Sequence, residues 1–157
     1  EWVMKGKPSV LGFCSGIVGG LVVVTPACGF VTPSGAMIIG VVAGIIPFLT
    51  VTYMKKWIGY DDALDTFGIH GVGGTLGAIM TGLLATGEAN AAITPELKQT
   101  LLLHQFYAMG ITIALAVVAT VGIGYVLKFT MGLRLSADAE REGLDTSDHG
   151  EEGYLFE

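Results

Sequence analysis

Charged residues are scarce in this chain of 157 residues, at 14% of the total, whereas apolar residues make up 52%. That balance excludes an ordinary soluble domain and is typical of an integral membrane protein. The sequence also lacks the alternation of apolar and polar residues that marks a transmembrane β-barrel. Helices are the remaining way to satisfy the backbone in hydrocarbon, so we predict an all-α membrane protein.

Cysteine and histidine are too few and too widely spaced to indicate a disulfide or a metal centre. Cys14 and Cys28 lie on one expected helix, about 21 Å apart in helical rise, and cannot bridge each other. No second histidine or cysteine lies three or four residues from His70, which counts against zinc. The sequence contains no redox, hydrolytic or nucleotide-binding motif. We therefore expect no enzyme activity, no cofactor, no metal and no nucleic-acid partner.

Four continuous apolar runs reach the length of about 20 residues that a helix needs to span a bilayer. They cover residues 10–31, 35–54, 66–85 and 101–127. We expect residues 1–133 to form a transmembrane bundle segment and residues 134–157 to form a soluble tail. From Arg134 onward the chain holds eight acidic and two basic residues, which accounts for its net charge of −6.

The basic residues indicate an orientation. They cluster before the first run, after the second and after the fourth, at Lys5, Lys7, Lys55, Lys56, Lys128 and Arg134. By the positive-inside rule, both ends of the chain face the cytoplasm, and the loop at residues 86–100 faces outward.

Glycine and proline suggest how the helices meet. Glycines recur every fourth residue in the first three runs, a spacing that lets helix backbones approach closely. Pro26 and Gly29 should break the first helix near its outer end. The chain begins at Glu1 without an initiator methionine or a signal peptide, so we expect a C-terminal segment of a longer protein.

His70 lies inside an apolar, glycine-rich run and is the most informative residue of the chain. An ionisable group in hydrocarbon is costly unless it has a partner or faces a filled path. If the third helix begins at Asp61, His70 lies nine residues along it, or about 14 Å, close to the bilayer midplane. A histidine bonded to another helix, a residue of a conduction path and a metal ligand remain as alternatives. Asp62 and Asp65 are expected to cap this helix.

Four parts of the sequence resemble the ammonium transporter (Amt/Mep/Rh) family. They are the second histidine motif from Asp61 to Gly82 (DDALDTFGIHGVGGTLGAIMTG), the stretches KGKPSVLG from Lys5 and GGLVVVTPACGFV from Gly19, and tail pieces around Gly132, Glu142 and His149. The resemblance covers nearly the whole chain. It implies the last four helices of an eleven-helix bundle with a pore in each subunit, assembled as a homotrimer in the plasma (inner) membrane.

The resemblance also implies roles for individual residues. His70 is similar to the second of two hydrogen-bonded pore histidines, and the first is expected on a helix outside this chain. Val18 and Thr66 match pore-lining positions, and Asp62 and Asp65 match acids at the cytoplasmic pore mouth. The implied substrate is ammonium or ammonia.

The acidic tail is similar to the family's regulatory tail, which couples subunits and faces PII-type signalling proteins. Its expected regulatory residues are Gly143, Asp145 and Ser147. Ser147 matches a position where some relatives carry a phosphorylated hydroxyl, and a phosphate there would repel Asp145. An ammonium sensor that signals through the tail is the alternative function, and a purely structural membrane segment is the other.

Overall fold

The computed structural model describes residues 1–151, and every regular element in that range is helical. It divides into two units, Glu1–Ile111 and a second that begins at Thr112, and each is described by itself. The first unit holds α1 (Trp2–Lys5), α2 (Val10–Val24), a 3₁₀ turn η1 (Thr25–Ala27), α3 (Pro33–Leu49), a π-helical segment η2 (Thr50–Met54), α4 (Lys55–Ile58), a second π-helical segment η3 (Phe67–Val72), α5 (Gly73–Leu84) and the start of α6 (Pro95–Thr130). The second holds the rest of α6, α7 (Ala137–Glu142) and a π-helical turn η4 (Asp145–His149).

Within residues 1–151, four helical stretches are long and apolar enough to cross a membrane, and each overlaps one of the four expected runs. They are Val10–Ala27, Pro33–Ile58, Phe67–Leu84 and Pro95–Thr130. The second consists of α3, η2 and α4 in direct succession, and the third of η3 followed by α5. The prediction of an all-α membrane chain with four spanning helices is thus confirmed.

Local sequence explains where the first two helices begin and end. The Ser9 hydroxyl accepts a hydrogen bond from the Gly12 amide at the start of α2, and Thr32 does the same for Gly35 at the start of α3. The α-helical part of the first span ends at Val24, directly before the Thr25–Ala27 turn that contains Pro26. The expected break near Pro26 is therefore present.

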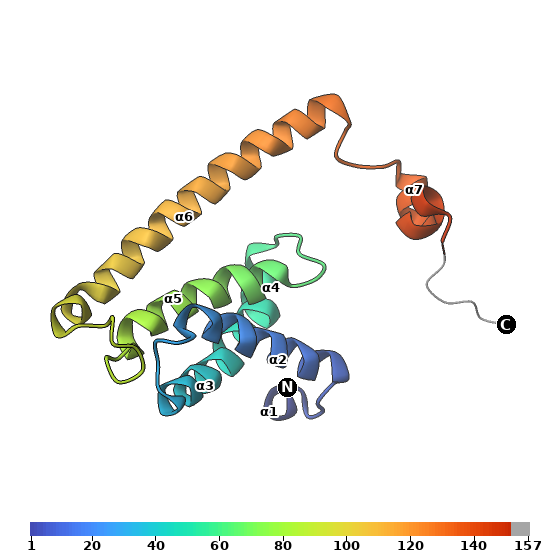
Figure 1. Ribbon diagram of the computed structural model, residues 1–157. Coiled ribbons are helices and arrows are strands. Elements are labelled where there is room, and N and C mark those ends of the chain that lie inside the picture. The colour runs from blue at the N-terminus through green and yellow to red at the C-terminus, as the bar shows by residue number, and fades with distance from the viewer. Residues whose placement is uncertain (152–157) are drawn as a thin grey trace. The chain divides into compact units, whose positions relative to one another are not determined.

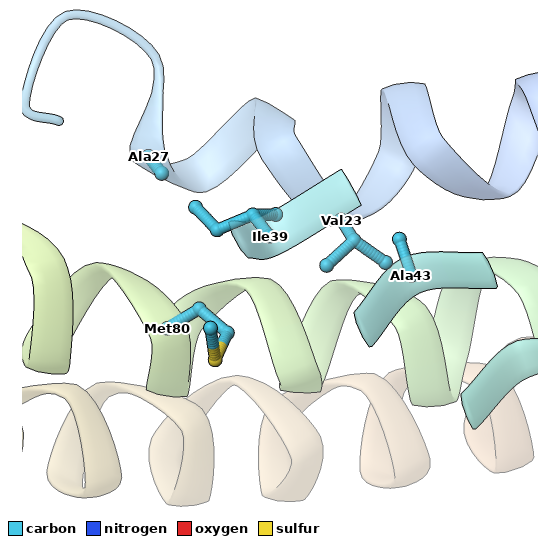
Figure 2. Packing of buried hydrophobic residues seen from close by; sticks show 5 residues of the cluster. All are labelled: Val23, Ala27, Ile39, Ala43 and Met80. Carbon is cyan, nitrogen blue, oxygen red and sulfur yellow. The ribbon is translucent and has the colours of Figure 1, made fainter. Parts of the chain in front are cut away.

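The core of the first unit lies where α2, α3 and α5 pack side by side (Figure 1). Figure 2 shows Val23 of α2, Ile39 and Ala43 of α3 and Met80 of α5 pointing toward one another, with Ala27 at the edge of the cluster. Val23, Ile39 and Ala27 are fully buried. This cluster holds the three helices together on the side away from the amino-terminal ends of α2 and η3.

The glycine contacts are divided unequally among the helices. Gly73 and Gly77 of α5 are buried against α2, where a methyl group at position 77 would overlap the carbonyl oxygen of Val23. Gly16 and Gly44, in contrast, have no neighbouring atom within 4 Å of a Cβ placed on them, and the same holds for Gly20 and Gly40. The expected close approach is thus made by α5 within the described part of the chain, and these glycines of α2 and α3 are open.

Two loops at the far end of the core bind each other. The Thr86 amide donates to the carbonyl oxygen of Phe30 at 2.9 Å, and the Asn90 side chain donates to that of Gly29 at 3.1 Å. The loop after α5 and the loop after η1 therefore lie on the same side of the first unit.

Candidate functional site around His70

His70 lies in the π-helical segment η3, near the beginning of the third span. The third helix begins at Phe67, close to the start of the expected span 66–85. The start at Asp61 that was assumed for the depth of His70 is wrong, because the chain before Phe67 forms a loop. Gly59 and Asp65 take left-handed backbone angles in that loop, with φ of 76° and 56°. Such angles interrupt a right-handed helix, and aspartate tolerates them better than most side chains. Single π-helical turns of this kind are often found at functional sites.

The position of His70 along the bundle can be read from the contacts of its own helix with the second span. A Cβ on Gly68 would lie 2.7 Å from the Val51 side chain, and one on Gly73 would lie 3.9 Å from Pro47. His70, between these two glycines, is level with about residue 49 of the span Pro33–Ile58. That position is nine residues from Ile58, or roughly 14 Å of helical rise.

Asp62 caps the helix that carries His70. Its carboxylate accepts a hydrogen bond from the Thr66 amide at 2.8 Å and another from the Phe67 amide at 2.9 Å. These are two of the free amides that a helix leaves at its beginning, where the helix dipole also favours negative charge. The capping role expected for Asp62 is therefore confirmed.

Asp65 forms an ion pair in place of a cap. Its Oδ1 atom lies 2.6 Å from the ammonium nitrogen of Lys55, at the start of α4, and Lys55 also donates to the carbonyl oxygen of Asp62. Both side chains are about one third exposed, Lys55 at 28% and Asp65 at 32%. The Asp65 carbonyl oxygen accepts from the Ile69 amide at 2.9 Å, so the backbone of Asp65 begins the hydrogen bonding of η3. The side chain ties the end of the second span to the start of the third.

The three expected pore residues are all exposed in the first unit. Thr66 and His70 are four residues apart, and Val18 on α2 is 40% exposed. Gly73 lies against Val22 and Gly77 against Pro26, so α2 and α5 run parallel. Val22 of α2 contacts Gly73 of α5. Val18 lies one helical turn before Val22, and His70 lies about one turn before Gly73. Val18 and His70 therefore lie at about the same height along two neighbouring helices, and Thr66 lies one turn closer to the start of η3.

A cavity of about 600 Å³ lies elsewhere in the first unit. It is lined by the amino-terminal residues, by the facing parts of α2 and α3, and by Asp65 and Ile69. Val18, Thr66 and His70 are not among its lining residues. Asp65 therefore faces this cavity, whereas the three expected pore residues lie on another surface.

The expected regulatory residues lie in the second unit, directly after α7. Gly143 takes a φ of 103°, and its carbonyl oxygen accepts from the Ser147 amide at 2.9 Å. Asp145 begins the turn η4, and its carbonyl oxygen accepts from the Glu151 amide at 3.0 Å. Arg134 donates two hydrogen bonds of 2.9 Å to the Glu140 carboxylate, which holds the pKa of Glu140 below its usual value. This short folded stretch brings the three predicted tail residues together.

Sequence reasoning missed two lysines that organise the first unit. Lys55 entered only as an orientation signal, yet it pairs with Asp65 ten residues away. Lys98 donates to the carbonyl oxygens of Gly82 at 3.0 Å and Leu83 at 2.9 Å, and so satisfies the end of α5. Sequence spacing does not predict either contact, because both depend on how a loop folds back.

Potential metal ligands do not gather in the part of the chain that the structure describes. Within it no three histidine, cysteine, aspartate or glutamate side chains are close enough together to hold an ion. The ionisable side chains around η3 include the His70 imidazole, the Asp62 and Asp65 carboxylates, the Lys55 ammonium group and the Tyr60 phenol.

The four apolar spans define the chain as part of an α-helical multi-pass membrane protein. The chain belongs to the Ammonium Transporter Family, whose model matches residues 1–154.

Individual relatives agree with that membership. The chain is 46% identical to an ammonium transporter of Aquifex aeolicus (strain VF5) over 159 residues, which is 98% of this chain and 36% of that protein. It is 43% identical to an ammonium transporter of Bacillus subtilis (strain 168) over 157 residues, or 98% of this chain and 39% of that protein. The crystal structure of Saccharomyces cerevisiae Mep2 is similar with a TM-score of 0.73 and 34% identity, covering 87% of this chain and 32% of that one. The chain thus spans between about a third and two fifths of the length of these relatives, and the curated ones are named as transporters.

Proposed function

We propose that this chain is the carboxyl-terminal portion of an ammonium transporter and that its exposed η3 surface lines part of the pore. The observation that carries the proposal is the position of His70, an exposed imidazole in a π-helical turn of a spanning helix. An ionisable side chain at that depth needs a partner or a filled path. Family membership supplies the reason for the path, and the partner is expected to be the first pore histidine of the complete protein.

The chemistry of the substrate explains why histidine suits this position. An apolar constriction rejects hydrated cations because they must lose their water, whereas neutral ammonia crosses more readily. Removal or relay of the ammonium proton is then the selective step. One imidazole nitrogen donates a hydrogen bond while the other accepts, and the ring exchanges protons near neutral pH. His70 would hydrogen-bond the passing ammonia and relay its proton inward.

Neighbouring residues complete the proposed path. Val18 lies level with His70 and would supply apolar wall, and Thr66 lies one turn closer to the beginning of η3. Asp62 and Asp65, at the start of that helix, would lie at the cytoplasmic mouth, with Asp65 on the side that faces the separate cavity. Residues 1–133 would be the membrane segment, with residues 134–157 and both ends of the chain in the cytoplasm, as the lysine distribution supports.

The assembly and its regulation are part of the same proposal. The complete protein would be a homotrimer in the plasma membrane, and the open glycines of α2 and α3 offer room for further helices. The tail turn around Gly143, Asp145 and Ser147 would respond to a PII-type protein or to phosphorylation.

Transport by the full-length parent protein in liposomes tests the role of His70. His70→Leu should lower the ammonium-evoked current about 100-fold or more, because the relay group is lost. His104→Leu, which removes an exposed imidazole from α6, is the matched control and should keep the current. Radiolabelled methylammonium uptake is measured alongside, and gel filtration checks that the trimer is intact.

The outcomes separate the alternatives. Unchanged current, uptake and selectivity in His70→Leu would overturn the pore role of this residue. A wild-type parent that binds ammonium but carries neither current nor methylammonium would favour the sensor over the transporter.

A further inference from the structure

The four-residue turn from Asp62 to Asp65 is held at both ends by one side chain, that of Lys55. Its ammonium group donates to the carbonyl oxygen of Asp62 and pairs with the carboxylate of Asp65 at 2.6 Å. The turn is also closed by its own backbone, because the Asp65 amide donates to the Asp62 carbonyl oxygen at 3.2 Å. Lys55 thus fixes this turn from a different spanning helix, the one that ends at Ile58.

The same turn determines how the His70 helix begins. The Asp62 carboxylate binds the amides of Thr66 and Phe67, and the Asp65 carbonyl oxygen binds the amide of Ile69. These three bonds set the first turn of η3, and His70 follows directly. A rotation of Asp65 out of its left-handed backbone conformation, at φ 56°, would rotate η3 about its axis.

From this geometry we infer that Lys55 is a positioning residue for His70, an inference that rests on the proposed transport function. A reacting group has to be held within about 0.5 Å of its productive place, and supporting hydrogen bonds supply that constraint. Lys55 does not act on the substrate itself. It holds the loop whose carboxylate and carbonyl groups set the direction of the imidazole.

Segment η3 is packed so closely on its neighbours that a small movement would displace it together with His70. A Cβ on Gly68 would lie 2.7 Å from Val51, and one on Gly71 would lie 2.9 Å from the Phe67 ring. The Phe67 ring in turn meets Tyr60 edge to face, with centroids 5.5 Å apart. Because η3 is packed this closely on η2 and on its own loop, loss of the Lys55 contacts is expected to shift the segment as a unit.

The test measures transport by the full-length parent in liposomes, with Lys55→Met as the main variant. Maximal methylammonium uptake should fall about tenfold to 100-fold, as expected for a misplaced reacting group, while KM changes less than about twofold. Lys55→Arg should restore most of the rate, since a guanidinium also pairs with a carboxylate. Lys56→Met is the matched control, because it removes the same charge from the next, exposed residue and should leave uptake unchanged.

A second variant keeps the inference testable if Lys55→Met does not assemble. Asp65→Asn removes the ion pair while keeping a side chain that tolerates a positive φ. It should reduce maximal uptake to the same extent, and the double variant Lys55→Met with Asp65→Asn should lose no more than either single one. Such non-additivity is the signature of two groups acting as one unit.

Failure of this inference is distinguishable from failure of the proposed function. If the wild-type parent transports and depends on His70, but Lys55→Met behaves like Lys56→Met, only the positioning role of Lys55 is overturned. A lowered rate that Lys55→Arg does not restore, or additive losses in the double variant, would also overturn it. If the wild-type parent does not transport, the proposed function itself fails.

Discussion

Each carboxylate around the functional elements takes its role from the donor that it meets. Asp62 accepts from two backbone amides and caps a helix, whereas Asp65 accepts from the Lys55 ammonium group. Glu140, in the second unit, meets both arms of the Arg134 guanidinium. Three chemically similar side chains therefore act as a cap, as a link between two spanning helices and as a clasp on a short helix.

The ion pair between Arg134 and Glu140 should make the stability of α7 depend on pH. The pKa of Glu140 is lowered from 4.5 by the Arg134 hydrogen bonds, so its stabilisation of the tail is fully present above pH 4.5 and is lost as the pH falls through the lowered value. At pH 7, Glu140→Gln should speed amide hydrogen exchange in α7 of the full-length parent about two- to fivefold. Glu142→Gln should not, because this neighbouring carboxylate forms no ion pair within residues 1–151.

The difference between Glu140→Gln and wild type should shrink as the pH is lowered below 4.5. An exchange rate that is the same in both proteins at pH 7 would contradict the prediction.

Helix contacts in the first unit depend on which side of each helix carries glycine. Gly77 of α5 lies directly against the backbone of α2 and the Pro26 ring, and Gly82 lies against Leu102 at the start of α6. The glycine at position 74 of the same helix has open space beside it. Small residues promote helix association in membranes because backbones can then approach, and that benefit exists only where a partner is present.

A pair of alanine substitutions tests this at the scale of one helix. Gly77→Ala should lower the free energy of unfolding of the full-length parent by about 1–3 kcal/mol, because α5 has to move away from the Val23 carbonyl group. Gly74→Ala is the control and should be neutral. Unfolding is followed by titration with a denaturing detergent, and equal stability of the two variants would contradict the close packing of α2 and α5.

Membrane orientation belongs to the scale of the whole molecule. The loops after η1 and α5 are bound to each other through Thr86 and Asn90, so they are on one side of the first unit. Lys55 and Lys56, at the start of α4, lie at the opposite end of the second span from these loops. Positive charge is retained on the cytoplasmic side during insertion, so in the proposed orientation the bound loops face outward.

Single cysteines introduced into a cysteine-free parent protein check this orientation. Glu88→Cys, in the exposed loop after α5, should react with an impermeant maleimide added to intact cells. Glu142→Cys, in the exposed tail helix, should react only after the membrane is permeabilised. The reverse pattern would overturn the proposed cytoplasmic location of both ends.

The sequence by itself determined the class of this protein and its four spanning helices. Those features depend on local properties, namely the length of apolar runs and the need of every backbone group in hydrocarbon for an internal partner. The capping of a helix by Asp62 was equally readable, because a cap acts within a few residues.

Only the tertiary structure decided which groups hold the start of the His70 helix in place. The loop before Phe67 replaces the helical turns expected from Asp61, because Lys55 of another helix binds the turn between Asp62 and Asp65. Which glycines pack against a neighbouring helix, and which have open space beside them, likewise depends on which helix lies opposite. Contacts between distant residues arise from the path of the chain through space, which local composition and spacing do not specify.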